Sequence, residues 1–126
     1  MSTLGVGTDL VEVDRIEALL GQHPVRFLDK YFRPGDLARS SANSSTSVGS
    51  MAESWAAKEA FLKALGTEVR KIPYRDVELI SSCGGTLSLN LYGMAENAAR
   101  QSGVCSIRVS VSSTPAAAVA LVVLGT

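Results

Sequence analysis

The sequence predicts an α+β domain in which a mostly antiparallel sheet is packed by one long helix. The first observation is a hairpin pattern, because residues 76–80 and 86–91 alternate between polar and apolar side chains and are joined through two consecutive glycines. The second is a similar pair near the C-terminus, where the alternating run 106–112 is followed by the apolar run 118–124. The third is an alanine-rich helical segment at 93–101, which stands between the two hairpins. Helices placed between hairpins favour antiparallel pairing.

The N-terminal part begins as a short strand with two glycines, which starts at Leu4 and is expected to end at Asp9. From Val13 the apolar positions change to helical spacing, and Gly21 is expected to end that helix. Pro24 is well suited to open a second, shorter helix. A strand and two helices are therefore predicted before the middle of the chain.

Residues 40–50 read SSANSSTSVGS and form the one low-complexity stretch of the sequence. Such a composition cannot bury enough apolar surface to order itself, so a mobile surface loop is predicted here. Ser50 and Glu53 match a capping box, which places the start of the long helix nearby or one turn earlier. The helix is expected to reach Leu65 and to stop at Gly66.

A length of 126 residues suits one domain that covers the whole chain, residues 1–126. The formal net charge is zero, which argues against a nucleic-acid partner. The most apolar run, 115–124, is too short to span a bilayer, and the N-terminus does not resemble a signal peptide. A cytoplasmic protein with no membrane partner is therefore expected. Cys83 and Cys105 lack metal-ligand spacing and are predicted to be reduced, mostly buried thiols.

The long helix carries three charged residues whose roles the helical spacing leaves open. In WAAKEAFLKALG, residues 55–66, Phe61 belongs to the predicted core stripe, while Glu59 and Lys63 lie one turn apart on another. With the acid first, such a pair fits a surface ion pair that contributes about 0.3–0.5 kcal/mol. Lys58 alone is nearly uninformative.

Asp9 suggests a second interpretation of the same charges. Carboxylates on two separate elements, each with lysines nearby, suit a magnesium ion bound to phosphates, because Mg²⁺ takes one or two carboxylates and the phosphate oxygens of the substrate. The lysines would neutralise the remaining phosphate charge. Asp9 as a simple helix N-cap is the open alternative. Gly5 and Gly7 lack the third glycine of a dinucleotide-binding turn, so that motif is absent.

Two segments together resemble the 4'-phosphopantetheinyl transferases, specifically the small holo-acyl-carrier-protein synthase type. The first is GVGTDLVEVDRI at residues 5–16, and the second is WAAKEAFLKA at residues 55–64. Each motif is moderately specific alone, but their order and their spacing of about 50 residues make the resemblance strong. The hairpin–helix–hairpin order downstream also fits, so the similarity covers essentially the whole chain.

The resemblance implies the 4'-phosphopantetheinyl transferase fold and an enzyme that moves the phosphopantetheine arm of coenzyme A to a serine of an apo acyl carrier protein. The implied cofactor is Mg²⁺, and the second product is 3',5'-ADP. By motif, Asp9 and Glu59 are the implied metal ligands and catalytic residues. Lys63 is implied to be a catalytic residue that contacts the pyrophosphate of coenzyme A. Lys58 is a weaker candidate for a phosphate contact. Metal-bound water or Glu59 would take the proton of the incoming serine.

The resemblance also implies partners for the enzyme. A basic helix after the first motif docks the acidic carrier protein, so Arg15 is an implied contact and Arg26 a second one, although either can be a solvated arginine. Glu12 could join the metal site or simply face solvent. Stand-alone relatives form trimers with each coenzyme A site at a subunit interface, so a homotrimer is expected.

Two positions depart from the family pattern, and both are predicted to contact coenzyme A. Ser54 stands where many stand-alone members carry an arginine that meets the 3'-phosphate. Members embedded in type I fatty acid synthases also tend to lack this arginine, so the carrier domain of such a synthase is an alternative partner. Ser113 stands in place of a histidine. A serine can hydrogen-bond a phosphate but cannot shuttle a proton near pH 7.

These departures keep two other functions open. One is a catalytically weakened relative that serves as a coenzyme A-binding or assembly module. The other is a magnesium-dependent hydrolase of small phosphates that uses the same carboxylates. An active transferase is the leading hypothesis.

Overall fold

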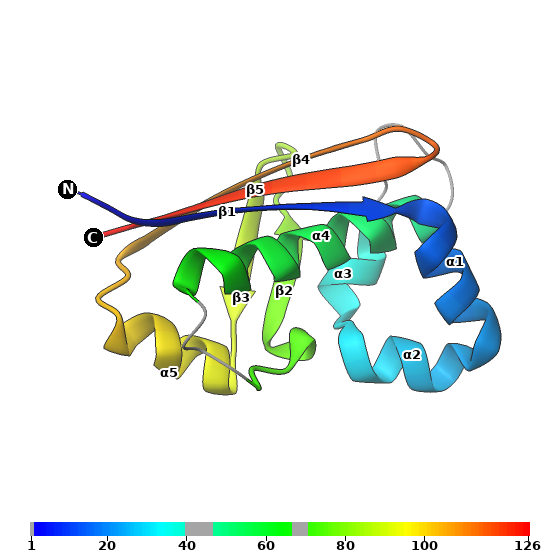
Figure 1. The fold of residues 1–126 in the computed structure, drawn as a ribbon, viewed down its shortest axis with the longest axis horizontal. Coiled ribbons are helices and arrows are strands. Elements are labelled where there is room, and N and C mark those ends of the chain that lie inside the picture. The colour runs from blue at the N-terminus through cyan, green and yellow to red at the C-terminus, as the bar shows by residue number, and fades with distance from the viewer. Residues whose placement is uncertain (1, 40–46, 67–70) are drawn as a thin grey trace.

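Two antiparallel sheets and one long helix organise the molecule (Figure 1). The structure is a computed structural model and describes residues 2–39, 47–66 and 71–126. Along the chain the elements are β1 (Thr3–Glu12), α1 (Val13–Gln22), α2 (Pro24–Tyr31), α3 (Pro34–Ala38), α4 (Ser47–Leu65), the 3-10 turn η1 (Tyr74–Asp76), β2 (Val77–Ser81), β3 (Leu87–Leu91), α5 (Gly93–Gln101), β4 (Ser106–Ser113) and β5 (Ala117–Gly125).

All strand pairs are antiparallel, and the predicted α+β class is confirmed. β5 lies between β1 and β4 in a three-stranded sheet, while β2 and β3 form a separate hairpin rather than part of the same sheet. Helix α4 lies between the three-stranded sheet and the layer that contains β2, β3 and the short helix α3 (Figure 1). Both predicted hairpins and the helix at 93–101 are confirmed.

Strand β1 is longer than predicted. It pairs with β5 beyond Asp9, which faces Ala120, and continues to Glu12. The reason is the apolar run of β5, which offers backbone partners and apolar side chains along its whole length. Asp9 therefore lies inside a strand, and the alternative of Asp9 as a helix N-cap is wrong. The N-cap position of α1 belongs to Glu12, whose side chain makes no capping hydrogen bond.

Strand β1 lies unusually close to α4 because of its two glycines. A Cβ atom on Gly7 would lie 2.0 Å from the carbonyl oxygen of Ala60, and one on Gly5 would lie 2.0 Å from that of Ala64. Strand alternation puts Asp9 on the same face as these glycines, toward α4. The glycines thus bring the Asp9 carboxylate to the helix that carries the second motif.

Helix α4 begins at Ser47, so the predicted alternative, a start one turn before Ser50, is confirmed, and Ser50 and Glu53 lie inside the helix and do not cap it. Of the predicted loop at 40–50, residues 40–46 lie outside the described residues, and the remainder is helical. The helix ends at Leu65, and Gly66 follows with φ +109°, as predicted for a helix stop.

The structure also bears on the end of the first helix, on the exposure of the two cysteines and on membrane-spanning helices. Helix α1 continues through Gly21 to Gln22, so Gly21 is not its stop. Cys83 and Cys105 are exposed rather than buried, because both lie in connections between elements. Within the described parts of the chain, no helix combines the length and the apolar character that crossing a membrane requires.

The outward face of the three-stranded sheet is rich in apolar side chains. Strands β1 and β5 alternate, so the residues that do not face α4 point away from the body of the molecule. Exposed large apolar residues on these two strands are Leu4, Val6, Leu10, Val119 and Leu121. A contiguous apolar face of this kind is typical of a surface that another molecule covers.

Candidate active site

Asp9 and Lys63 meet where β1 crosses α4. The Lys63 Nζ atom lies 2.9 Å from Asp9 Oδ1, and it also donates a hydrogen bond of 3.2 Å to the carbonyl oxygen of Thr8. The hydrogen bond and charge of Asp9 raise the pKa of Lys63, and the charge of Glu59 acts in the same direction. The Lys63 side chain is 55% exposed, so the ammonium group faces solvent beside two carboxylates.

Glu59 is held by two neutral donors instead of by Lys63. Its Oε1 atom accepts a hydrogen bond of 3.0 Å from Trp55 Nε1 and one of 2.8 Å from the Tyr74 hydroxyl. Burial and the Glu59 carboxylate raise the pKa of Tyr74, so the phenol stays protonated and donates at neutral pH. Sequence reasoning named neither Trp55 nor Tyr74 as a partner of Glu59.

The two carboxylates fit a magnesium ion that shares its coordination with a phosphate. Asp9 and Glu59 come from different elements, and within the described residues neither Asp9 Oδ2 nor Glu59 Oε2 takes part in a hydrogen bond. The same part of the chain contains no group of three His, Cys, Asp or Glu residues arranged for a metal. Two carboxylates suit Mg²⁺, which keeps water and substrate oxygens, better than a closed protein cage.

The predicted carrier contacts lie on the helices beside this site. The Arg15 guanidinium on α1 is 5.9 Å from the centroid of the Trp55 ring, a cation–π contact at the edge of the site. Arg26 is exposed on α2. Glu12 is exposed too, and strand alternation places it on the opposite face of β1 from Asp9.

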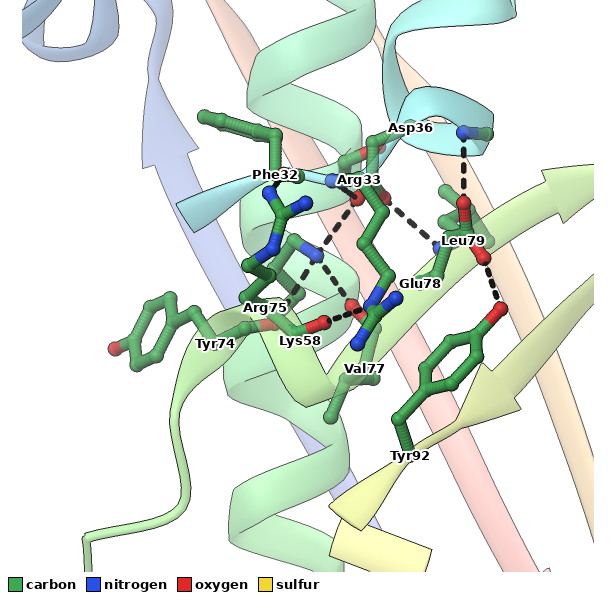
Figure 2. A network of polar contacts seen from close by, with 12 residues as sticks. Phe32, Arg33, Asp36, Lys58, Tyr74, Arg75, Val77, Glu78, Leu79 and Tyr92 are labelled. Carbon is green, nitrogen blue, oxygen red and sulfur yellow. Dashed lines mark hydrogen bonds and ion pairs between the residues drawn. The ribbon is translucent and has the colours of Figure 1, made fainter. Parts of the chain in front are cut away.

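Lys58 does not join these residues. Its side chain is fully buried, and Nζ lies 2.9 Å from Asp36 Oδ2 and donates to the carbonyl oxygens of Tyr74 and Val77 (Figure 2). Burial lowers the pKa of Lys58, against the opposing charge of Asp36. With all three ammonium donors directed at protein oxygens, Lys58 is placed as a structural residue rather than a phosphate contact.

The surroundings of Lys58 form one connected network, drawn in Figure 2. Asp36 also accepts hydrogen bonds of 2.9 Å from the backbone N–H groups of Arg33 and Leu79. Nearby, Glu78 accepts from the N–H of Gly35 at 2.7 Å and from the Tyr92 hydroxyl at 2.6 Å. These contacts join α3, α4 and β2.

Ser54 and Ser113, the two departures from the family pattern, belong to a second buried cluster. Arg39 donates to Ser54 Oγ at 3.0 Å and forms an ion pair of 3.1 Å with Glu53. Ser113 donates to the other carboxylate oxygen of Glu53 at 2.6 Å. The Ser113 hydroxyl hydrogen is thus directed at Glu53, and a guanidinium from the end of α3 lies beside residue 54.

This second cluster borders a cavity of about 810 Å³. Arg39, Glu53 and Ser113 provide its polar side, and Ile80, Leu87 and Val111 contribute apolar lining. The buried Arg39 Nε atom has no hydrogen-bond partner among the residues that the structure describes. Arg39 was not singled out from the sequence, because its partners are distant in the chain and no local spacing marks them.

The fold and the site define a small α+β protein with a candidate metal and phosphate site between a glycine-containing strand and a helix. The chain belongs to the 4'-phosphopantetheinyl transferase superfamily, whose family model matches residues 5–120. Its curated relatives include the holo-[acyl-carrier-protein] synthase of Desulfovibrio desulfuricans, 40% identical over 122 residues and 96% of both chains. That of Geobacter sp. (strain M21) is 39% identical over 95% of this chain and 96% of its own. The enzyme is therefore of the holo-[acyl-carrier-protein] synthase type.

Solved structures agree with this assignment. The holo-[acyl-carrier-protein] synthase of Neisseria meningitidis superposes with a TM-score of 0.86 at 25% identity and covers 99% of this chain and 100% of its own. The synthase of Plasmodium yoelii gives a TM-score of 0.81 at 27% identity, with 98% and 94% covered. The Bacillus anthracis synthase, solved in complex with coenzyme A (3',5'-ADP), gives 0.71 at 25% identity, with 97% and 96% covered.

Proposed function

We propose that this enzyme transfers the 4'-phosphopantetheine arm of coenzyme A to a serine of an apo acyl carrier protein, uses Mg²⁺ held by Asp9 and Glu59, and releases 3',5'-ADP. The observation that carries the proposal is the ion pair of Asp9 with Lys63, whose ammonium group also lies within the electrostatic influence of Glu59, so that the two motifs of the sequence come together in the fold. The names of the relatives and the coenzyme A complex of the Bacillus anthracis synthase support the same reaction.

Each residue of the site has a distinct task in this proposal. When bound, Mg²⁺ would orient the pyrophosphate of coenzyme A and stabilise the charge on the leaving ADP. Lys63 exchanges Asp9 for the pyrophosphate and neutralises it as a point charge, which its exposure permits. Either a water on the metal or Glu59 would take the proton of the carrier serine.

We propose that Arg39 partly replaces the cation missing at Ser54, and that Glu53 limits what Arg39 and Ser113 can offer to coenzyme A. Arg39 brings a guanidinium to Ser54, so a cation is available there although residue 54 is a serine. Glu53 neutralises part of that charge, and it also engages Ser113. Contact of Arg39 with the 3'-phosphate of coenzyme A is therefore expected to be weaker than that of an arginine without an acidic partner.

The carrier and the assembly are also part of the proposal. The exposed Arg15 and Arg26 lie on consecutive helices and suit an acidic carrier surface. The apolar outer face of β1 and β5 supports self-association, and we propose a homotrimer, which a sizing experiment tests. A carrier domain of a type I fatty acid synthase is the alternative partner, and the cytoplasmic location stays a prediction.

A transfer assay tests the proposed function. Apo acyl carrier protein and, in parallel, a type I synthase carrier domain are incubated with the enzyme, coenzyme A and Mg²⁺, and mass spectrometry follows the gain of one phosphopantetheine. Chelation of Mg²⁺ and Glu59→Ala are expected to abolish the gain. Glu96→Ala is the matched control, because Glu96 is an exposed helical glutamate on α5 whose ion-pair partner is Arg100 of the same helix. If no carrier gains mass although the folded enzyme binds coenzyme A, the proposed reaction is wrong.

One observation favours a second candidate function. Because the Ser113 hydroxyl is directed at Glu53, it is less available to a phosphate than the sequence alone indicates. A protein that binds coenzyme A but transfers its arm slowly would serve as a binding or assembly module. Ser113→His decides between the two: a large gain in transfer rate supports the weakened relative, and an unchanged, already rapid rate contradicts it.

A further inference from the structure

We propose that Tyr74 and Trp55 are positioning residues that hold Glu59 in the orientation required to bind the metal. The inference rests on the proposed function, because it takes Glu59 as a metal ligand. It adds two residues that do not touch the substrate or the metal themselves. Tyr74 lies on η1, outside both motifs, and Trp55 is the first residue of the second motif, which by itself gives no role to the indole N–H.

The geometry of the two hydrogen bonds carries the proposal. Trp55 Nε1 and the Tyr74 hydroxyl both donate to the same atom, Glu59 Oε1, at 3.0 and 2.8 Å. A glutamate side chain turns about three bonds, and two donors from different elements remove most of that freedom. Within the described residues, Oε2 is left without a hydrogen bond, so one oxygen is fixed while the other stays available to a ligand.

Both donors are themselves firmly placed. The Trp55 side chain is buried, with Trp55 only 5% exposed, and its ring centroid lies 5.0 Å from that of Tyr31 and 4.9 Å from that of Tyr74. The backbone of Tyr74 is held from the other side, because its carbonyl oxygen accepts a hydrogen bond of 3.1 Å from the buried Lys58. In Figure 2 the Tyr74 ring points away from that network. The network therefore anchors the segment whose hydroxyl reaches Glu59.

Neutral donors suit this task better than a cation. A lysine or an arginine on Oε1 would compensate the carboxylate charge and compete with a metal ion for it. A phenol and an indole fix the geometry and leave the net charge of Glu59 unchanged. Outer residues that orient a metal ligand in this way typically change metal affinity or activity 10–100-fold when they are removed.

The decisive experiment compares two tyrosine variants of the full chain. Tyr74→Phe removes the hydroxyl that donates a hydrogen bond to Glu59. Tyr92→Phe removes an equivalent hydrogen bond from a tyrosine to a glutamate, the one that Tyr92 donates to Glu78. Binding of Mn²⁺, as a paramagnetic substitute for Mg²⁺, is measured with coenzyme A present from the electron paramagnetic resonance signal of the free ion. Tyr74→Phe is expected to weaken Mn²⁺ binding about 10-fold, and Tyr92→Phe to leave it unchanged.

A kinetic readout and a second donor variant complete the test. Tyr74→Phe is expected to raise the Mg²⁺ concentration that gives half-maximal transfer, whereas the rate at saturating Mg²⁺ largely recovers. Trp55→Phe keeps an aromatic ring in the cluster and removes the indole donor together with part of the ring system, so it is expected to act in the same direction. It also serves as the deciding variant if Tyr74→Phe does not fold.

Glu59→Gln separates the failure of this inference from failure of the proposed function. If Glu59→Gln loses Mn²⁺ binding while Tyr74→Phe and Trp55→Phe bind as the wild type does, the positioning role is overturned and the metal site stands. If Glu59→Gln itself binds Mn²⁺ normally, the metal assignment fails and the inference fails with it. Equal losses of stability for Tyr74→Phe and Tyr92→Phe without a difference in metal binding would show a purely structural role.

Discussion

Lys58 and Lys63 lie little more than one turn apart on α4, and each pairs with an aspartate at 2.9 Å, yet their surroundings are opposite. Both partners of the Lys58–Asp36 pair are fully buried, whereas the Lys63 side chain is 55% exposed and that of Asp9 is 11% exposed. Burial lowers the pKa of Lys58, while Asp9 raises the pKa of Lys63. The same residue type at the same distance from the same partner type therefore serves two purposes.

Burial, and not the presence of an ion pair, therefore decides which of the two lysines can act on a ligand. Lys58 cannot leave Asp36 without leaving a charge unpaired in the protein interior, which is strongly unfavourable. Lys63 can exchange Asp9 for a phosphate at little cost, because its ammonium group already faces solvent and such ion pairs contribute only about 0–1 kcal/mol. One pair holds the fold, and the other is ready to be rearranged.

The largest expected effect comes from breaking the buried pair. Lys58→Met leaves Asp36 charged and buried, so the free energy of unfolding should fall by about 3–5 kcal/mol, measured by urea denaturation. Asp36→Asn added to Lys58→Met removes the unpaired charge and should recover part of the loss. A cost below about 1 kcal/mol for Lys58→Met would contradict the structural role given to this pair.

A somewhat smaller loss of stability is expected when the close contact between β1 and α4, beside Asp9 and Lys63, is disturbed. In Gly7→Ala the new Cβ atom would lie 2.0 Å from the Ala60 carbonyl oxygen, so strand and helix must move apart. Overpacking of this kind costs typically about 1–3 kcal/mol, and the shift should also impair transfer by displacing Asp9. Thermal denaturation and the transfer assay measure both effects.

Gly21→Ala is the matched control for that variant. Gly21 is inside α1, and a Cβ atom there would meet nothing within 4 Å. Replacing a helical glycine by alanine should stabilise the protein by roughly 0.5–1 kcal/mol. If both alanine variants behave alike, the close contact between β1 and α4 does not explain the glycine at position 7.

The contrast between the two lysines also shows what the sequence could predict. The two motifs predict a set of Asp9, Glu59 and Lys63, and in the structure Lys63 pairs with Asp9 and is influenced by the charge of Glu59, while their roles in the reaction stay a proposal. The hairpins and the helix stop at Gly66 follow from local patterns, since alternation and glycine act over a few residues. Local rules succeeded where the cause was local.

The remainder depends on contacts between distant segments. Lys58 looked uninformative because its partner Asp36 lies on another helix, and nothing in the local spacing marks it as buried. The hydrogen bond from Tyr74 to Glu59 likewise joins η1 to α4. The end of β1 was misplaced because the pairing that extends it is made by β5, near the other end of the chain.

Removing the exposed lysine should separate activity from stability. Lys63→Ala is expected to lower the free energy of unfolding by about 1 kcal/mol at most, because the Lys63 ammonium is exposed, while the Asp9 side chain it leaves behind is 11% exposed and stays in contact with solvent. Transfer should fall about 100-fold, the typical effect of removing one group that stabilises developing charge. Urea denaturation and the carrier assay on one preparation test both halves. A variant that loses stability but keeps its rate would reverse the roles of the two lysines.

The smallest expected effect is a difference in how the two lysines respond to pH. The pKa of Lys58 is lowered from an ordinary value of 10.5, so between that lowered value and 10.5 the unfolded chain binds more protons than the folded one. The contribution of Lys58 to stability therefore rises as the pH approaches 10.5. The pKa of Lys63 is raised, so its contribution is fully present below 10.5 and is lost only above that value. Denaturation of the wild type, Lys58→Met and Lys63→Ala from about pH 8 upward tests this. The difference in the free energy of unfolding between the wild type and Lys58→Met should widen as the pH rises toward 10.5. The corresponding difference for Lys63→Ala should stay constant over the same range. A difference for Lys58→Met that narrows with rising pH would mean that burial does not dominate the environment of this lysine.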